Sequence, residues 1–181
     1  MLCVTHWLFA QNLYILDSVA TDYNVHAVCD SDLHLYSKRK LDKGSVTLLW
    51  YRHLDDFIIP LSIDDDHSVG IQFQITPQQY MFLFQVSLPC SNHSITVYRE
   101  YMEKLYDMCN MYSPLDTVIY LGDFNAKIDI SSRHSRDNIL YNVLSDVNFV
   151  AANTLPCCRG ATCSYVSYDN SELTTLTIMG P

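Results

Sequence analysis

The sequence predicts a mixed α/β domain of the α+β kind, with helices packed on β-sheets. Three observations predict it. Apolar residues alternate strictly with Gly or Gln over residues 69–75, apolar stripes recur at helical spacing after residue 94 and after residue 136, and a buried-looking strand ends in a polar turn at residues 118–125. A chain of 181 residues, 49% hydrophobic and 17% charged, is long and apolar enough to bury a sizeable core.

The first fifty residues predict a short helix and two strands. The helix spans residues 7–19, which mix aliphatic and aromatic positions with few charges, and the strands span 23–29 and 45–51. Residues 30–44 between the strands are polar and basic and read as a loop.

Residues 45–88 predict an antiparallel meander, because their strands are joined by short turns. Within it, Pro60 lies in a strand over 57–63 and favours an edge position or a bulge, since proline donates no ladder hydrogen bond. Residues 69–75 predict one buried and one wet face, and the nearly continuous apolar run over 80–88 predicts a strand deep in the sheet. Turns are expected at 55–56, 64–66 and 76–79.

Two amphipathic helices are predicted in the second half. Ser94 is a favourable N-cap for the first, which Ser113-Pro114 ends. The second spans about 136–146. The inward positions are Ile95, Tyr98, Met102, Leu105 and Cys109 in the first, and Ile139, Leu140, Val143 and Leu144 in the second. Short strands are expected at 148–152 and 163–167, whereas the tail over 174–181 has no strong pattern.

Composition narrows the function classes. The formal net charge of -9 counts against tight nonspecific DNA binding, and the basic cluster at 38–43 is interpreted as a solvated loop. The seven cysteines form no CxxC pair or zinc-type spacing, so free thiols are expected. The first residues lack the basic end and long apolar stretch typical of a signal peptide, and no apolar run reaches membrane-spanning length. We therefore expect an intracellular protein without membrane contact.

The chemistry is expected at Gly122-Asp123-Phe124-Asn125, directly after the apolar strand 118–121. Glycine permits a tight turn there. Asp123 is suited to act as a general base or metal ligand, and Asn125 to orient a water molecule or a phosphate oxygen. Turn chemistry alone also explains Asp and Asn after a strand, but the full string at a strand's end favours function.

These residues, with several segments in the same order, resemble the endonuclease/exonuclease/phosphatase superfamily. Within it, the likeness is greatest to endonuclease domains of non-LTR retrotransposons. The Gly-Asp-Phe-Asn string is specific by itself, and the others count as a series: Thr5-His6-Trp7-Leu8, Lys43-Gly44-Ser45-Val46-Thr47-Leu48-Leu49, Val86-Ser87-Leu88-Pro89 and Thr162-Cys163-Ser164-Tyr165.

The resemblance implies a four-layer sandwich, two mixed β-sheets flanked by helices, over a single domain spanning 1–181. It also implies Mg²⁺-dependent cleavage of phosphate esters, with DNA as the partner and no obligate protein partner. In that scheme Asp123 positions and deprotonates the attacking water, and Asn125 holds a phosphate oxygen.

The departures from the family pattern predict weak or absent activity. Thr5 stands at the position of the family's metal-binding glutamate, and Ser87 at that of its active-site tyrosine. The first family strand is cut to Met1–Val4, and residues 172–181 lack the family's late aspartate and histidine, so the domain is expected to be incomplete at both ends. Catalytic residues that act as a unit lose nearly all of their rate enhancement when one of them is removed.

Three hypotheses follow. The chain is a Mg²⁺-dependent nuclease of retrotransposon type, weak or inactive; or a non-catalytic remnant or binding module of the same fold; or a phosphatase or phosphodiesterase acting on a small phosphorylated substrate.

Overall fold

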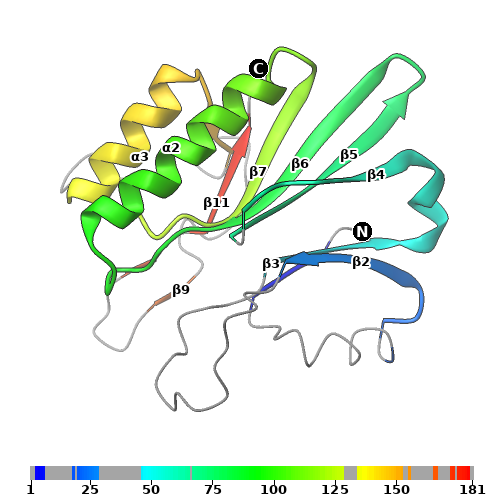
Figure 1. Ribbon diagram of the computed structural model, residues 1–181, viewed down its shortest axis with the longest axis horizontal. Coiled ribbons are helices and arrows are strands. Elements are labelled where there is room, and N and C mark those ends of the chain that lie inside the picture. The colour runs from blue at the N-terminus through cyan, green and yellow to red at the C-terminus, as the bar shows by residue number, and fades with distance from the viewer. Residues whose placement is uncertain are drawn as a thin grey trace. The chain divides into compact units, whose positions relative to one another are not determined.

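The computed structural model describes residues 3–6, 18, 20–28, 46–65, 67–128, 134–152, 155, 165–166, 172–173 and 175–179. Most of the helix expected over 7–19 and the loop expected over 30–44 lie outside these ranges. The chain divides into two compact units, Met1–Ser87 and Leu88–Pro181, and most of their elements are labelled in Figure 1.

A three-stranded antiparallel sheet opens the first unit. Its order is β1 (Cys3–His6), β3 (Val46–Tyr51) and β2 (Tyr23–Val28), which confirms the expected strands at 23–29 and 45–51 to within a residue. Strand β3 has a hydrogen-bonded neighbour on each side, and it is buried from Val46 to Trp50. It therefore forms the centre of this sheet.

The turn expected at residues 55–56 is a 3-10 helix, η2 (Arg52–Phe57). Asp55 in this helix accepts a hydrogen bond from Trp50 Nε1 at 2.7 Å and another from the side-chain amide of Asn24. These bonds tie the helix back to β3 and β2. Strand β3 pairs with β1 and β2 alone among the described strands, so the expectation that it joins the meander is wrong.

The meander itself is confirmed for the next three strands. Strands β4 (Ile58–Leu61), β5 (Ser68–Thr76) and β6 (Gln79–Ser87) pair in order and antiparallel. Within the first unit β4 pairs with β5 on one side only, so Pro60 occupies the edge position that its missing N–H requires.

Burial in β5 changes along the strand and not from face to face, which corrects the prediction from its alternating sequence. Residues 68–71 are buried on both faces, while Ile75 at the far end is 54% exposed. The cause lies at Gly70, where an added Cβ would sit 2.6 Å from the ring of Phe84. The Phe84 ring covers the face that the sequence pattern leaves open.

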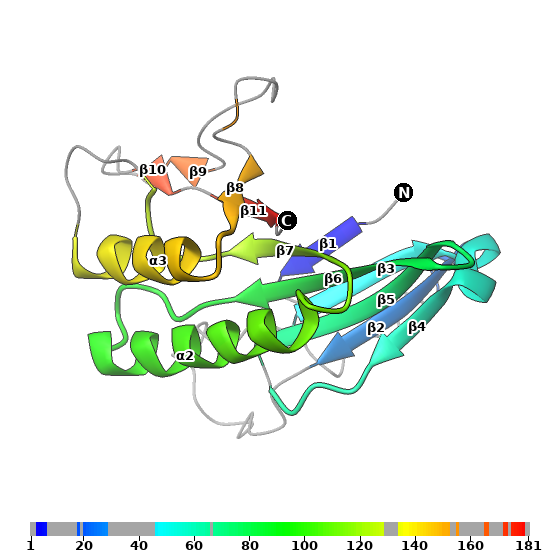
Figure 2. The same cartoon turned by 90° about the horizontal axis from the view of Figure 1, so that it is seen from above.

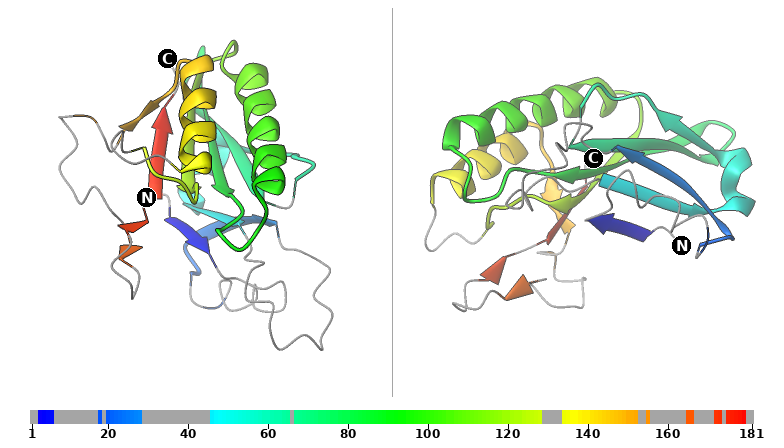
Figure 3. Two further views of the ribbon diagram at one scale, coloured as in Figure 1. Left: turned by 90° about the vertical axis from the view of Figure 1, so that its left-hand side faces the viewer. Right: turned by 60° about the horizontal axis from the view of Figure 1, so that its bottom comes forward.

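The second unit contains both long helices. Helix α2 (Ile95–Tyr112) begins at Ser94, whose hydroxyl accepts the Val97 N–H at 3.3 Å, and its buried residues are four of the five predicted ones. Helix α3 (Ser135–Asp146) buries Leu140 and Leu144, as predicted. The two helices contact each other and run side by side in both views of Figure 3.

Strand β7 (Thr117–Asp123) carries the chain from α2 to the candidate site. Its burial alternates strictly, with Val118, Tyr120 and Gly122 buried and the residues between them half-buried. Cys109 of α2 contacts Tyr120, so α2 packs on the face of β7 that carries the buried side chains. Because successive strand residues point to opposite faces, Asp123 points to the other face.

The tail, for which the sequence predicted no element, is an interior strand of the second unit's sheet. Strand β11 (Thr175–Met179) pairs antiparallel with β7 and with β8 (Val150–Ala151). The three strands lie near one another in Figure 2. Strands β9 (Tyr165–Val166) and β10 (Glu172–Leu173) form a separate pair, and β8 and β9 confirm the two short strands predicted from the sequence. Among the described helices, none is long and apolar enough to cross a membrane.

Candidate catalytic site at the end of strand β7

The strand that ends at Asp123 requires a glycine before it. Gly122 is buried and has a φ of 140°, a backbone conformation that L-residues rarely adopt. In register, Asp123 lies opposite Thr175 of β11, so the last pair of the β7–β11 ladder sets its position. The tight turn expected at this glycine lies one step later: Gly122 is still part of β7, opposite Leu176, and the chain turns at Asp123–Asn125.

Asp123 and Asn125 are brought together by a local turn. Oδ1 of Asp123 accepts the backbone N–H of Asn125 at 3.0 Å, which is an Asx turn. Asn125 has a φ of 46°, in the left-handed region that asparagine tolerates better than most residues. Both side chains are half-buried, so each is held in place and still reaches the surface.

Leu88 fastens this turn from the neighbouring chain segment. Asn125 Nδ2 donates to the carbonyl oxygen of Leu88 at 2.7 Å, and the N–H of Leu88 donates to the carbonyl oxygen of Asp123 at 2.8 Å. Leu88 is itself buried. The reciprocal bonds therefore fix the distance between the candidate carboxylate and the start of the segment 88–93.

Phe124, the residue between the two polar ones, anchors the turn in the core. Its side chain is fully buried, and its carbonyl oxygen accepts the hydroxyl of Tyr98 at 2.9 Å. Tyr98 is also fully buried on α2. This side chain was predicted only as part of an apolar stripe, yet its hydroxyl holds the backbone of the candidate site.

Arg136 pins the segment 88–93 from helix α3. Its guanidinium donates to the carbonyl oxygens of Pro89 and His93, the latter at 2.7 Å, and its Cζ lies 4.8 Å from the centre of the Tyr98 ring. A planar guanidinium suits this arrangement, because it donates in two directions while stacking on an aromatic face. Arg136 thus joins α3, α2 and the segment that holds Asn125.

Asp137 closes the other side of the site. It is 4% exposed, and its carboxylate accepts the N–H of Lys127 at 2.8 Å and the N–H of His134 at 3.0 Å. The first bond fixes the chain that leaves the Asn125 turn, and the second caps α3. The sequence signal for it was available, because an acidic residue in the first turn of an amphipathic helix is a typical capping residue.

Electrostatics at the site keep Tyr98 in its neutral form. Burial raises the pKa of the Tyr98 hydroxyl well above its usual range; the positive charge of Arg136 lowers it in part, and the carboxylates of Asp137 and Asp123 raise it further. The hydroxyl therefore keeps its proton and remains a donor to Phe124.

The family positions with replaced residues lie in the first unit. Thr5 is on β1, opposite Thr47 in register, and Ser87 is the last residue of β6, with its carbonyl oxygen 2.9 Å from His67 Nδ1. Asp123 and Asn125 belong to the second unit. Of the residues singled out from the sequence, the structure thus assembles these two into one local site.

The side chains that the structure describes do not supply the donors of a complete Mg²⁺ site. Within the described ranges, no three His, Cys, Asp or Glu side chains are grouped so as to hold a metal ion. At the candidate site, one oxygen of Asp123 already accepts a backbone N–H, and the neighbouring carboxylate of Asp137 accepts two. A hard dication prefers several carboxylate oxygens as ligands. The carboxylates of Asp123 and Asp137 leave few oxygens free to bind one.

Solved structures similar to this one identify the fold. D. rerio TDP2, complexed with a single-strand DNA product, has a TM-score of 0.59 at 13% identity over 98% of this chain and 69% of that one. The endonuclease domain of TRAS1, a telomere-specific non-LTR retrotransposon, has a TM-score of 0.57 at 13% identity over 98% and 84%. An AP endonuclease from Archaeoglobus fulgidus has a TM-score of 0.66 at 12% identity over 99% and 76%.

These proteins belong to the endonuclease/exonuclease/phosphatase superfamily. At such low identity the likeness establishes the fold alone, and the chain has the α+β fold that these proteins share, as the motifs predicted. No protein-family model matches the sequence. No curated protein matches it either.

Proposed function

We propose that this chain is a nuclease-type domain of the retrotransposon kind, directed at DNA phosphodiesters, whose Mg²⁺-supported cleavage is weak or absent. Asp123 and Asn125 are its remaining site. The observation that carries the proposal is the Asx turn at the end of β7, in which the Asp123 carboxylate accepts the backbone N–H of Asn125 on a stiff strand end.

The two side chains have distinct roles in this proposal. Oδ1 of Asp123 holds the turn, and within the described ranges no hydrogen bond engages its other oxygen, which is the one that would accept a proton from an attacking water. The amide of Asn125 is oriented by its bond to Leu88, which directs its oxygen away from that carbonyl and toward a phosphate or water.

Weak activity follows from what surrounds these two groups. The described donors suit Mg²⁺ poorly, so charge that builds up on the phosphate is poorly neutralised. The formal net charge of -9 opposes the approach of a polyanion and slows association. One carboxylate with one amide retains a small part of what a complete set of catalytic residues achieves.

The test is nicking of supercoiled plasmid in Mg²⁺ by wild type and by Asp123→Asn. This change preserves the shape of the side chain and removes the carboxylate. We expect slow nicking by wild type and at least about a hundredfold less by the variant, the usual loss for a general base. Asp56→Asn, at an exposed position of the first unit, makes the same chemical change elsewhere and should nick like wild type. Equal nicking by all three proteins would refute a catalytic role for Asp123.

A non-catalytic binding module is the second candidate, and a specific observation favours it. Asp123 and Asn125 both form internal hydrogen bonds that any turn of this shape would use. The double variant Thr5→Glu with Ser87→Tyr restores two family side chains. If the domain is only a binding module, this variant should bind labelled DNA as wild type does and still fail to nick it. Rescue of nicking by these two changes would argue against this candidate.

A further inference from the structure

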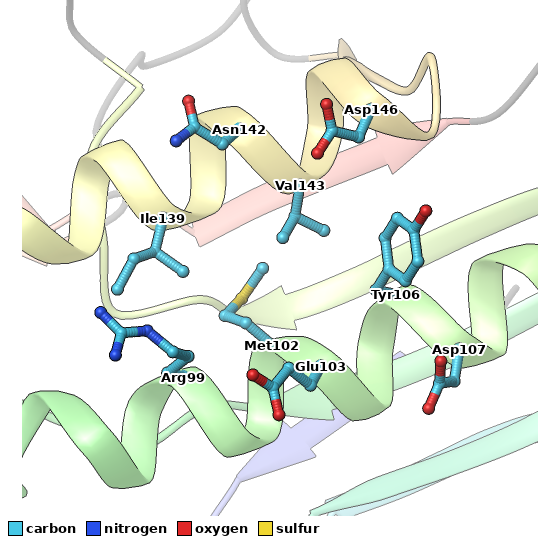
Figure 4. A pocket seen from close by; sticks show the side chains of 9 residues that line it. All are labelled: Arg99, Met102, Glu103, Tyr106, Asp107, Ile139, Asn142, Val143 and Asp146. Carbon is cyan, nitrogen blue, oxygen red and sulfur yellow. The ribbon is translucent and has the colours of Figure 1, made fainter.

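An open groove of about 640 Å³ lies between helices α2 and α3, which line it (Figure 4). The floor is apolar and is made by Met102, Ile139 and Val143. Met102 is 1% exposed, and the other two are half-buried, although both were predicted as inward-facing core residues. The groove thus leaves apolar side chains of α3 partly uncovered.

The lining follows one row of residues on each helix. On α2 these are Arg99, Glu103 and Tyr106, and on α3 they are Ile139, Val143 and Asp146, with the spacing i, i+4, i+7 on both. The labelled residues of the two helices run in the same direction in Figure 4. The groove is therefore a straight channel about two helical turns, or ~10 Å, long.

The rim carries an excess of carboxylates. Glu103, Asp107 and Asp146 are exposed, and Arg99 is the one cation among the lining residues. Within the described ranges no ion pair engages these groups. Figure 4 shows Arg99 at the Ile139 end and both aspartates toward the Tyr106 end, so one end of the groove is negative and the other carries the positive charge.

We propose that this groove docks an amphipathic helix of a partner protein, with an apolar face for the floor and Lys or Arg residues toward the Tyr106 end. Helical peptides bind grooves of this kind through residues at i, i+3, i+4 and i+7. The unpaired carboxylates select basic side chains, and Tyr106, which is 38% exposed, offers its ring to one of those cations. An acidic residue at the other end of the ligand would meet Arg99.

The charge of the rim also decides against nucleic acid at this surface. Three carboxylates against one guanidinium repel phosphates. Docking in the groove is therefore independent of the function proposed for Asp123 and Asn125, and the nicking assay does not bear on it.

The probe is a fluorescein-labelled amphipathic helical peptide of about 14 residues, with Leu at the i, i+4 and i+7 positions, Lys at one end and Glu at the other. Binding is followed by fluorescence anisotropy. We expect saturable binding to wild type, weakened about tenfold or more in Glu103→Lys with Asp146→Lys, because two attractive contacts become repulsive. Glu100→Lys with Asp56→Lys makes the same change in net charge at exposed positions outside the groove and should bind within about twofold of wild type.

A second peptide, with every Lys and Glu exchanged for the other, makes the test reciprocal. It should prefer the Glu103→Lys, Asp146→Lys variant to wild type. The proposal is overturned if the first peptide shows no saturable binding, or if it binds wild type and that variant equally. Sedimentation that shows a wild-type dimer, lost in the same variant, would overturn it too, because it assigns the groove to a second copy of this chain.

Discussion

Asn125 combines two demands that few other residues meet. Its backbone is in the left-handed region, with a φ of 46°, and its side chain donates to the buried carbonyl of Leu88. Asparagine tolerates that conformation and carries a short amide donor. The same residue therefore supports the turn and ties its side-chain amide to Leu88. Experiments are needed to separate this structural role from the proposed functional one.

Two substitutions at Asn125 separate the contribution of its side-chain hydrogen bond to stability from that of its left-handed backbone. Asn125→Gly removes the side-chain hydrogen bond and keeps the backbone free of strain, whereas Asn125→Ala removes the bond and adds strain. We expect a loss of about 1 kcal/mol in the free energy of unfolding for Gly, and up to about 1 kcal/mol more for Ala. Urea unfolding measures both. An alanine variant as stable as the glycine variant would show that the left-handed backbone carries no cost.

At the level of elements, helix α3 holds the site through its first turn. Arg136 and Asp137 are adjacent in sequence, and their side chains reach the two chain segments on either side of the Asn125 turn, 88–93 and Lys127. The first turn of α3 thus holds two loop segments in place, one of them more than forty residues away in sequence. A buried aspartate and an arginine that donates to two carbonyls therefore have a structural role at the start of this helix.

Arg136→Lys tests this link. A lysine keeps the charge but cannot donate to both carbonyls from a plane stacked on Tyr98. We expect the free energy of unfolding to fall by about 2 kcal/mol, the range for hydrogen bonds to a charged group. Arg99→Lys, at an exposed position of α2, is the matched control and should stay within about 0.5 kcal/mol of wild type. Equal stability of the two variants would mean that the carbonyl contacts contribute nothing net.

For the whole molecule, three buried acids with raised pKa values make stability depend on pH in the alkaline range. Burial raises the pKa of the Cys109 thiol from 9.0 to about 11, and it raises the pKa of the Tyr98 and Tyr120 hydroxyls well above their usual range. Their neutral forms are favoured in the folded state. The stability that they contribute is complete below the unfolded-state pKa and is lost as pH rises toward the folded-state value.

The free energy of unfolding should therefore be insensitive to these groups up to about pH 8 and decline from about pH 9 upward. Cys109 alone should cost about 2 kcal/mol between pH 8 and pH 11, and the two tyrosines add to the loss above pH 10. Urea unfolding at a series of pH values measures the decline. A free energy that stays constant from pH 8 to pH 11 would contradict it.

Patterns that local chemistry determines were predictable. The N-cap at Ser94, the buried stripe of α2, the strand end at Asp123 and the antiparallel pairing of β4, β5 and β6 all follow from residues close in sequence. The prediction was wrong where distant residues decide. The Phe84 ring buries the second face of β5, η2 separates β3 from the meander, and the tail forms β11.

The sequence by itself determined the fold class, because hydrophobic period, capping and turn chemistry act over a few neighbouring residues. The same local signals led to the two residues proposed for the candidate site. Tertiary structure alone decided what holds that site. The carbonyls of Leu88 and Pro89, the hydroxyl of Tyr98 and the guanidinium of Arg136 meet there only once helices and strands have packed. Hydrogen bonds between residues 26 to 47 positions apart leave no local pattern in a sequence, since each partner is an ordinary residue until the fold brings it into contact.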